Sequence, residues 1–124
     1  ITEGVIKRDS GTLRCHLNEE FSLRVRSVPP DEDTREAITH FKVLKRTHHT
    51  TLVELKLETG RRHQIRVHLS DMGHPIVGDK PYGATTDPAR RLGLHSSELH
   101  FIHPATEEKM DFVLPLPDAL AKLV

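Results

Sequence analysis

Large aromatic side chains and cysteine are scarce in this sequence. The 124 residues contain no Trp, one Tyr, four Phe and a single Cys, Cys15. A single cysteine excludes an internal disulfide and is typical of a protein from a reducing compartment. Apolar residues make up only 35% of the chain. We therefore expect a single domain with a thin core, which is either marginally stable alone or covered on one face by a neighbour.

Long hydrophobic runs are also missing. No segment approaches the roughly 20 apolar residues of a membrane span, and the N-terminus has no apolar stretch of the signal-peptide kind. The first residue is Ile1 rather than Met, so we expect the natural start to lie elsewhere. Together these features predict a cytoplasmic protein, present here as a fragment.

Charge of one sign is not in excess. The 18 Lys and Arg residues balance 18 Asp and Glu residues, so the overall charge does not favour nucleic acid or membrane. The basic residues are concentrated, however, between Lys42 and Arg66, where the only acidic residues are Glu54 and Glu58. This distribution predicts a local basic surface on a neutral protein.

Alternation of apolar and polar residues predicts two adjacent strands, over residues 37–45 and 51–57. The polar segment 46–50 between them has the length of a hairpin turn, which makes an antiparallel pair the natural arrangement. Residues 5–33 look short and broken, with a turn at Ser10 and Gly11.

A helix is predicted directly after Gly60. Ile65, Leu69 and Met72 recur at the spacing of one buried helical face, and Gly73 is a typical helix end.

The rest of the chain predicts only short elements. We expect a short strand at 75–77, a loop over 78–88, strands at 98–103 and 109–114, and a last helix at 117–123. The predicted fold is therefore α+β, with an antiparallel or mixed sheet and a few short helices, in one domain covering residues 1–124.

The start of the predicted helix carries the clearest functional signal. Unpaired N–H groups at a helix N-terminus favour anions, whereas cations oppose the helix dipole. Three arginines at and near this end, Arg61, Arg62 and Arg66, therefore indicate a bound phosphate or carboxylate. The alternative is a solvated basic helix with weak surface ion pairs.

Four segments then resemble one family in the same order. Residues 60–68 read G-R-R-H-Q-I-R-V-H, residues 35–44 read R-E-A-I-T-H-F-K-V-L, residues 73–83 read G-H-P-I-V-G-D-K-P-Y-G, and residues 94–104 read L-H-S-S-E-L-H-F-I-H-P. These segments are similar to the G-R-x-H-Q-I-R-x-H motif and its neighbours in RNA pseudouridine synthases of the RluA/RluD type. Residues 3–9 also resemble the segment that follows the first half-site of that family.

The resemblance implies an activity and roles for several residues. Such enzymes isomerise uridine to pseudouridine in ribosomal or transfer RNA, through a nucleophilic aspartate and without metal or cofactor. Arg66 matches the arginine that pairs with this aspartate. Arg61, Arg62, His63 and Gln64 match RNA-contacting or scaffold positions, and a further match is the apolar wall against the uracil, formed by Leu99 with Leu94.

The nucleophile motif of the family, H-R-L-D-R-x-T-S-G, has no counterpart in the sequence. Lys7 to Gly11 imitates it superficially, but the leucine before Asp9 is missing and the segment matches a region downstream of the true motif. We therefore expect a fragment of a catalytic domain, inactive alone, that lacks the N-terminal part of that domain. Arg66 would then have no carboxylate partner within the chain, and Asp79 would be a turn or surface carboxylate.

Other functions fit the sequence less well. His63 and His68 lie five residues apart, on different helical faces, so the ten histidines do not predict a metal site. No Ser-x-x-Lys or Gly-x-Ser-x-Gly motif appears. A non-catalytic RNA-binding module is the main rival, and its affinity would fall steeply with salt.

Overall fold

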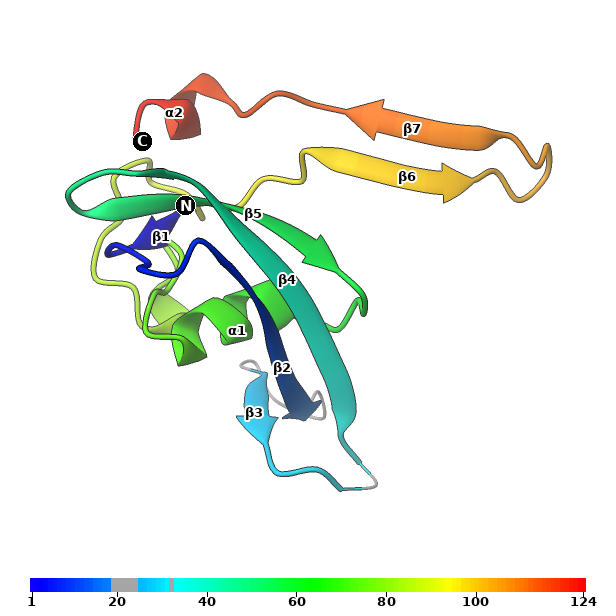
Figure 1. Ribbon diagram of the computed structural model, residues 1–124, viewed down its shortest axis with the longest axis horizontal. Helices are drawn as coiled ribbons and strands as arrows, with labels where there is room; N and C mark the ends of the chain where they lie inside the picture. The colour runs from blue at the N-terminus through cyan, green and yellow to red at the C-terminus, as the bar shows by residue number, and fades with distance from the viewer. Residues whose placement is uncertain (19–24, 32) are drawn as a thin grey trace.

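The computed structural model describes residues 1–18, 25–31 and 33–124, and it contains a five-stranded sheet, a separate hairpin and a few short helices (Figure 1). The larger sheet is antiparallel throughout and has the order β1-β5-β4-β2-β3. Its strands are β1 (Thr2–Glu3), β2 (Ser10–Asn18), β3 (Arg26–Val28), β4 (Arg35–Arg46) and β5 (Thr50–Leu57). The predicted α+β class with antiparallel pairing is confirmed.

The predicted β4–β5 hairpin is present. Its turn is closed by a hydrogen bond from the Thr47 N–H to the Thr50 carbonyl oxygen, at 2.9 Å. The register shifts between Val43 and Lys45, so Leu44 forms a bulge and its side chain is exposed. Such a bulge bends the long β4 strand locally.

The predicted turn at Ser10 and Gly11 is wrong, because both residues begin the strand β2. This strand pairs with β4 over eight residue pairs. This strand position is a glycine because the ring of Phe41 approaches it closely. A Cβ atom at Gly11 would lie 2.7 Å from Phe41 Cε1. Glycine inside a strand marks such close approaches. Within the broken segment expected at 5–33, residues 19–24 and 32 lie outside the described part of the chain.

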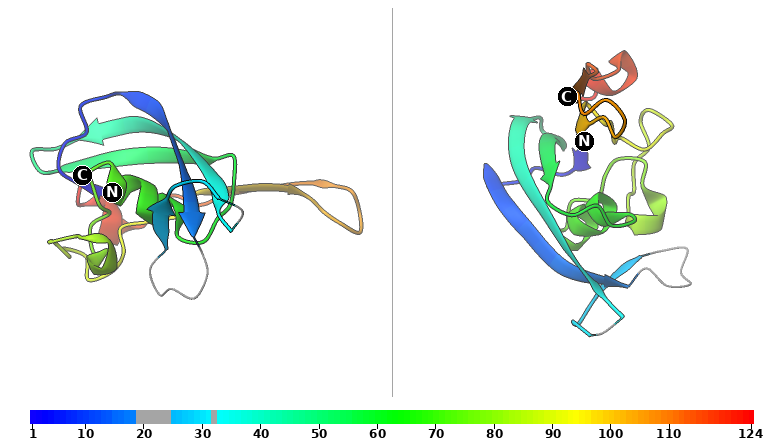
Figure 2. Two further views of the ribbon diagram at one scale, coloured as in Figure 1. Left: turned by 90° about the horizontal axis from the view of Figure 1, so that it is seen from below. Right: turned by 90° about the vertical axis from the view of Figure 1, so that its right-hand side faces the viewer.

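Helix α1 (Gln64–Asp71) covers one face of the sheet (Figure 2). It ends as predicted, since Gly73 has a φ of +89°, a conformation that glycine adopts without strain. The predicted buried face is only partly correct: Leu69 is buried, whereas Ile65 and Met72 are half-buried. Val67 joins the main core instead, which contains Leu17, Val25, Ala37, Val67 and Tyr82.

The segment after α1 is more ordered than predicted. The strand expected at 75–77 is reduced to a single bridge between Thr2 and Ile76. The loop expected at 78–88 contains a 3-10 turn, η1 (Lys80–Tyr82), which follows a positive φ of +81° at Gly78.

The hairpin of β6 (Glu98–Ile102) and β7 (Lys109–Val113) extends away from the body of the domain (Figures 1 and 2). Several large apolar side chains of the hairpin and its C-terminal flank are exposed, namely Leu99, Phe101, Ile102, Phe112, Val113 and Leu114. A two-stranded hairpin alone is marginally stable in water, so this arrangement favours a neighbour. The chain then ends with the short helix α2 (Asp118–Ala121), which buries Leu120.

Candidate active site

The loop between β5 and α1 places the two adjacent arginines at the edge of the domain. Arg61 is half-buried and its Nε donates to the Glu36 carbonyl oxygen at 3.1 Å, which ties the loop to β4. Arg62 is exposed. Both arginines thus lie just before the start of α1, and the Arg62 side chain is open to solvent.

Gln64 occupies the centre of a buried hydrogen-bond network. Its Oε1 accepts from the Thr59 hydroxyl at 2.7 Å and from the Arg61 N–H at 3.0 Å. Its Nε2 donates to the Ile38 carbonyl oxygen at 2.9 Å and to Thr39 Oγ1 at 3.0 Å. The side chain is only 2% exposed, and both acceptor sites and both N–H groups are used. Gln64 therefore joins the helix start to β4 and has no group left for RNA.

Arg66 has a carboxylate partner within the chain, which corrects the expectation that it has none. Its Nε donates to Asp79 Oδ2 at 3.0 Å and its Nη2 donates to Asp79 Oδ1 at 2.7 Å. The Asp79 side chain is fully buried, whereas the Arg66 side chain is 21% exposed. Asp79 thus lies at the end of a turn, as one of the two expected placements has it, but it is not a surface carboxylate. The hydrogen bond to Asp79, ahead of the opposing effect of burial, raises the pKa of Arg66 further.

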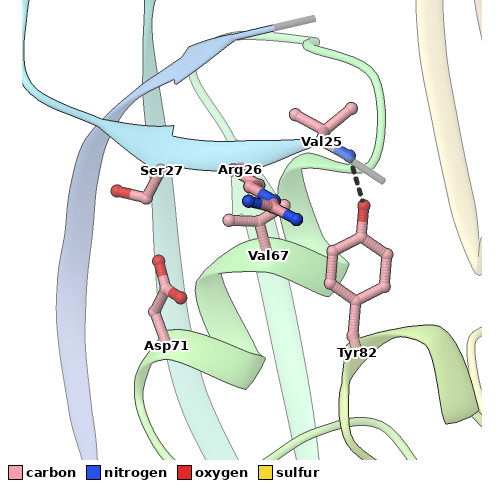
Figure 3. A pocket seen from close by; sticks show the side chains of 6 residues that line it. All are labelled: Val25, Arg26, Ser27, Val67, Asp71 and Tyr82. Atoms are coloured by element: carbon pink, nitrogen blue, oxygen red, sulfur yellow. Dashed lines mark hydrogen bonds between the residues drawn. The ribbon is translucent and has the colours of Figure 1, made fainter. Parts of the chain in front are cut away.

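Tyr82 lies at the junction between this ion pair and the start of α1. The Arg66 Cζ atom is 4.8 Å from the centroid of the Tyr82 ring, a cation–π distance. The hydroxyl accepts from the Val25 N–H at 2.9 Å, beside a pocket of about 220 Å³ (Figure 3). The pocket is lined by Val25, Arg26, Ser27, Val67, Asp71 and Tyr82.

His63 contacts the same tyrosine from a strained backbone position. Its Nδ1 is 2.9 Å from the Tyr82 hydroxyl, and the two rings meet edge to face. Its φ of +56° lies in the left-handed region, which is uncommon for a residue other than glycine and often marks a functional site. Burial, followed by the positive charges of Arg66 and Arg62, lowers the pKa of His63. His63 is thus a neutral imidazole at pH 7.

His68, on another side of α1, belongs to the core. Its Nδ1 is 2.7 Å from Thr39 Oγ1 and its Nε2 is 3.0 Å from Cys15 Sγ. Burial is the main cause that lowers the pKa of His68 and raises the pKa of the Cys15 thiol. At neutral pH the pair therefore consists of a neutral imidazole and a protonated thiol, which is a poor nucleophile.

A large groove adjoins the other face of α1. It has a volume of about 910 Å³, and its lining comes from β5, from α1 and from the segment leading into β6. Leu99, Leu94, Ile65 and Leu69 all lie on it. Leu99 is 56% exposed. Among the described residues, no hydrogen bond or ion pair joins Leu99 to the predicted residues at the helix start.

Asp79 is the site residue that sequence reasoning missed, although a signal for it exists. The apolar residues Ile76 and Val77 directly precede Gly78 and Asp79. Such an apolar pair indicates that the backbone of this segment runs through the core, as it does in the structure. Tyr82, in the same segment, is likewise buried, with 2% of its surface exposed.

The described part of the chain was also compared with what a metal site and a membrane-spanning helix require. Its His, Cys, Asp and Glu side chains nowhere gather in threes in a way that would hold a metal ion. None of the helices there has the length and apolar character that a membrane span requires.

The fold and the site together define an α+β domain with a basic helix start, a buried carboxylate behind it and an open groove beside it. Residues 4–71 match the family model described as RNA pseudouridylate synthase. The chain belongs to this family.

Several relatives extend the comparison. The uncharacterized RNA pseudouridine synthase YjbO of Bacillus subtilis is 50% identical over 125 residues, which cover 100% of this chain and 44% of the relative. The ribosomal large subunit pseudouridine synthase D of Haemophilus influenzae is 36% identical over 102 residues, or 71% of this chain and 32% of that protein. The resemblance to the RluA/RluD type is thereby confirmed.

A solved structure agrees with these matches. Human RNA Pseudouridylate Synthase Domain Containing 1 superimposes with a TM-score of 0.77 and 27% identity, over 92% of this chain and 51% of that one. The chain thus spans about half or less of the length of these relatives.

Proposed function

We propose that this chain is the C-terminal part of the catalytic domain of a cytoplasmic RNA pseudouridine synthase. The substrate is uridine in structured RNA, ribosomal or transfer, and the reaction needs no metal or cofactor. The nucleophilic aspartate comes from a part of the domain outside these 124 residues. Family membership supports the reaction, and the lack of an H-R-L-D-type motif in the sequence supports the missing nucleophile.

The groove beside α1 is the observation that carries this proposal. The strand β5 pairs with β1 only at Thr50 and Thr51, so in the described part of the chain its edge from Leu52 to Leu57 has no strand partner on that side. The strand β6 pairs only with β7 among the described strands. Both unpaired edges belong to strands that line the groove. Unpaired edges beside an apolar groove favour additional strands as the occupant.

The length of the relatives supports one occupant over others. The chain covers 44% of YjbO and 51% of the human structure, so a comparable length of polypeptide remains in each of them. We assign the groove to the N-terminal part of the same catalytic domain, which would also cover the exposed Leu99 and Leu57.

The chemistry then divides between the two parts of the domain. The N1–C1′ bond of uridine breaks, a C5–C1′ bond forms, the C5 proton leaves to solvent and N1 takes up a proton. Arg66 keeps the incoming aspartate ionised, since a neighbouring guanidinium stabilises a carboxylate anion. Leu99 provides an apolar wall for the extruded base, and Arg61 and Arg62 hold the RNA phosphates.

This reaction releases the hydrogen bound to C5, so tritium release from RNA labelled at uridine C5 tests the proposal. We expect the 124-residue chain alone to release none above the buffer level. A chimera in which this chain replaces its matching 44% of YjbO should release tritium at a rate comparable to YjbO itself.

Two outcomes contradict the proposal in different ways. Release by the 124-residue chain alone would show that it already contains a complete site. If YjbO releases tritium but the chimera does not, the proposed activity is wrong and a non-catalytic RNA-binding module becomes the better assignment.

Arg61→Gln and Arg62→Gln should weaken binding of a transfer RNA to the chimera. We expect each to remove about one phosphate contact, which lowers the slope of log K against log salt by about 1. Fluorescence anisotropy at several salt concentrations measures both quantities. Lys122→Gln, an exposed change on the far end of the chain, is the matched control, and an equal effect there would refute a specific RNA surface at the helix start.

A further inference from the structure

In the described part of the chain, the Arg66 guanidinium donates hydrogen bonds through only one of its edges. A guanidinium has five N–H groups, and Asp79 accepts one from Nε and one from Nη2. The two N–H groups of Nη1 and the second one of Nη2 donate to no residue in the described part of the chain. The opposite edge, formed by Nη1 and Nη2, therefore still has the geometry that a second carboxylate would engage.

Asp79 itself is unable to serve as the nucleophile. Its side chain has no exposed surface, so no atom of a substrate reaches it. Its backbone is also fixed: the N–H donates to the Ile76 carbonyl oxygen at 3.0 Å, and its carbonyl oxygen accepts from Tyr82 and Ala84, each at 3.1 Å. The carboxylate is thus a rigid support behind the arginine.

A second contact fixes the plane of the same guanidinium. The Tyr82 ring lies 4.8 Å from Arg66 Cζ. The Tyr82 hydroxyl contacts Val25 and His63, which hold the ring in place. The backbone carbonyl oxygen of Tyr82 accepts a hydrogen bond from the Ser70 hydroxyl at 2.6 Å. An arginine that is oriented before its partner arrives loses less freedom when the partner binds.

We propose that Asp79 is a positioning residue of the catalytic site. It holds Arg66 by the Nε–Nη2 edge and thereby presents the Nη1–Nη2 edge to the nucleophilic aspartate. This inference rests on the proposed function. It adds that the active arginine is shared by two carboxylates, one buried and structural, the other reactive.

The test uses the chimera of this chain with YjbO and the tritium-release assay. Asp79→Asn should lower kcat by about 30- to 100-fold, because a small misplacement of a catalytic group costs about that factor. The KM for RNA should stay within threefold, since Asp79 touches no RNA. Asp9→Asn is the matched control, because it removes a carboxylate from an exposed ion pair with Arg46, and it should leave kcat unchanged.

A double-mutant cycle separates positioning from simple stability. Arg66→Lys should itself lower kcat at least as much as Asp79→Asn, and adding Asp79→Asn to it should cost less than a further threefold. All rates are measured at a temperature where circular dichroism shows each variant folded. If Asp79→Asn does not fold, Asp79→Glu replaces it, because the longer side chain keeps the charge and displaces the guanidinium.

The outcomes are distinct for the two proposals. If YjbO releases tritium but the chimera with wild-type residues does not, the proposed function is overturned, and this inference with it. An active chimera in which Asp79→Asn keeps kcat within threefold, or in which the two substitutions multiply, would overturn the inference alone.

Discussion

Gln64→Met should lower the free energy of unfolding of the chain by about 2–4 kcal/mol. Methionine keeps most of the volume, so the loss comes from the four hydrogen bonds of a side chain that is 2% exposed. Each such bond contributes about 1 kcal/mol net, and a buried partner left unsatisfied, such as the Arg61 N–H, adds to the cost. Urea denaturation followed by circular dichroism measures the change.

The same variant decides between two roles for this residue. If Gln64 is structural, the folded chimera carrying Gln64→Met should bind transfer RNA within twofold of the unaltered chimera, whereas Arg62→Gln binds more weakly. A stability loss under 1 kcal/mol together with a clear loss of RNA affinity would show that Gln64 contacts RNA after all.

Gly78→Ala should be about as damaging, with a loss of about 2–4 kcal/mol in the free energy of unfolding. Gly78 has a φ of +81°, and a Cβ atom there would overlap the backbone carbonyl oxygen of Arg91. The left-handed conformation costs a non-glycine residue about 1–2 kcal/mol, and forced overpacking adds about 1–3 kcal/mol. The next residue is Asp79, so the shift also disturbs the ion pair with Arg66.

Gly73→Ala is the matched control for that prediction. Gly73 also has a positive φ, of +89°, but nothing lies within 4 Å of the position that a Cβ atom would take there. Gly73→Ala should therefore lower the free energy of unfolding only by the cost of the left-handed backbone conformation, about 1–2 kcal/mol. Equal losses for the two variants in the same urea experiment would show that the overlap with Arg91 relaxes without cost.

The sequence predicts local elements well where one periodicity dominates. The alternation over 37–57 led to the β4–β5 hairpin, and the spacing of Leu69 with its neighbours led to α1. The strand β2 was missed because its Ser10–Gly11 start resembles a turn. The reason for that glycine is the ring of Phe41 on β4, a strand that is adjacent in the sheet but thirty positions away in the sequence. Local pattern carries no information about such a contact.

The candidate site shows the same division. The cluster of basic residues at the start of α1 is visible in the sequence because its members are neighbours along the chain. The pairing of Arg66 with Asp79 is not visible, since Asp79 lies thirteen positions after Arg66, beyond the end of α1 and the turn at Gly78. Likewise, only the folded arrangement shows that Gln64 is enclosed by Thr39 and Thr59, whereas its motif position left an RNA contact and a scaffold role both open.

The edges of β5 and β6 that have no strand partner in the described part of the chain also bear on solubility. Open strand edges flanked by apolar side chains are templates for intermolecular pairing and aggregation. Charged residues interrupt the apolar pattern on both strands, with Glu54 and Lys56 on β5 and Glu98 on β6. Such interruptions act as gatekeepers against self-association. Under the proposed function, the polypeptide that completes the groove would therefore have a second effect besides catalysis: it would remove the surface through which copies of this chain could otherwise pair.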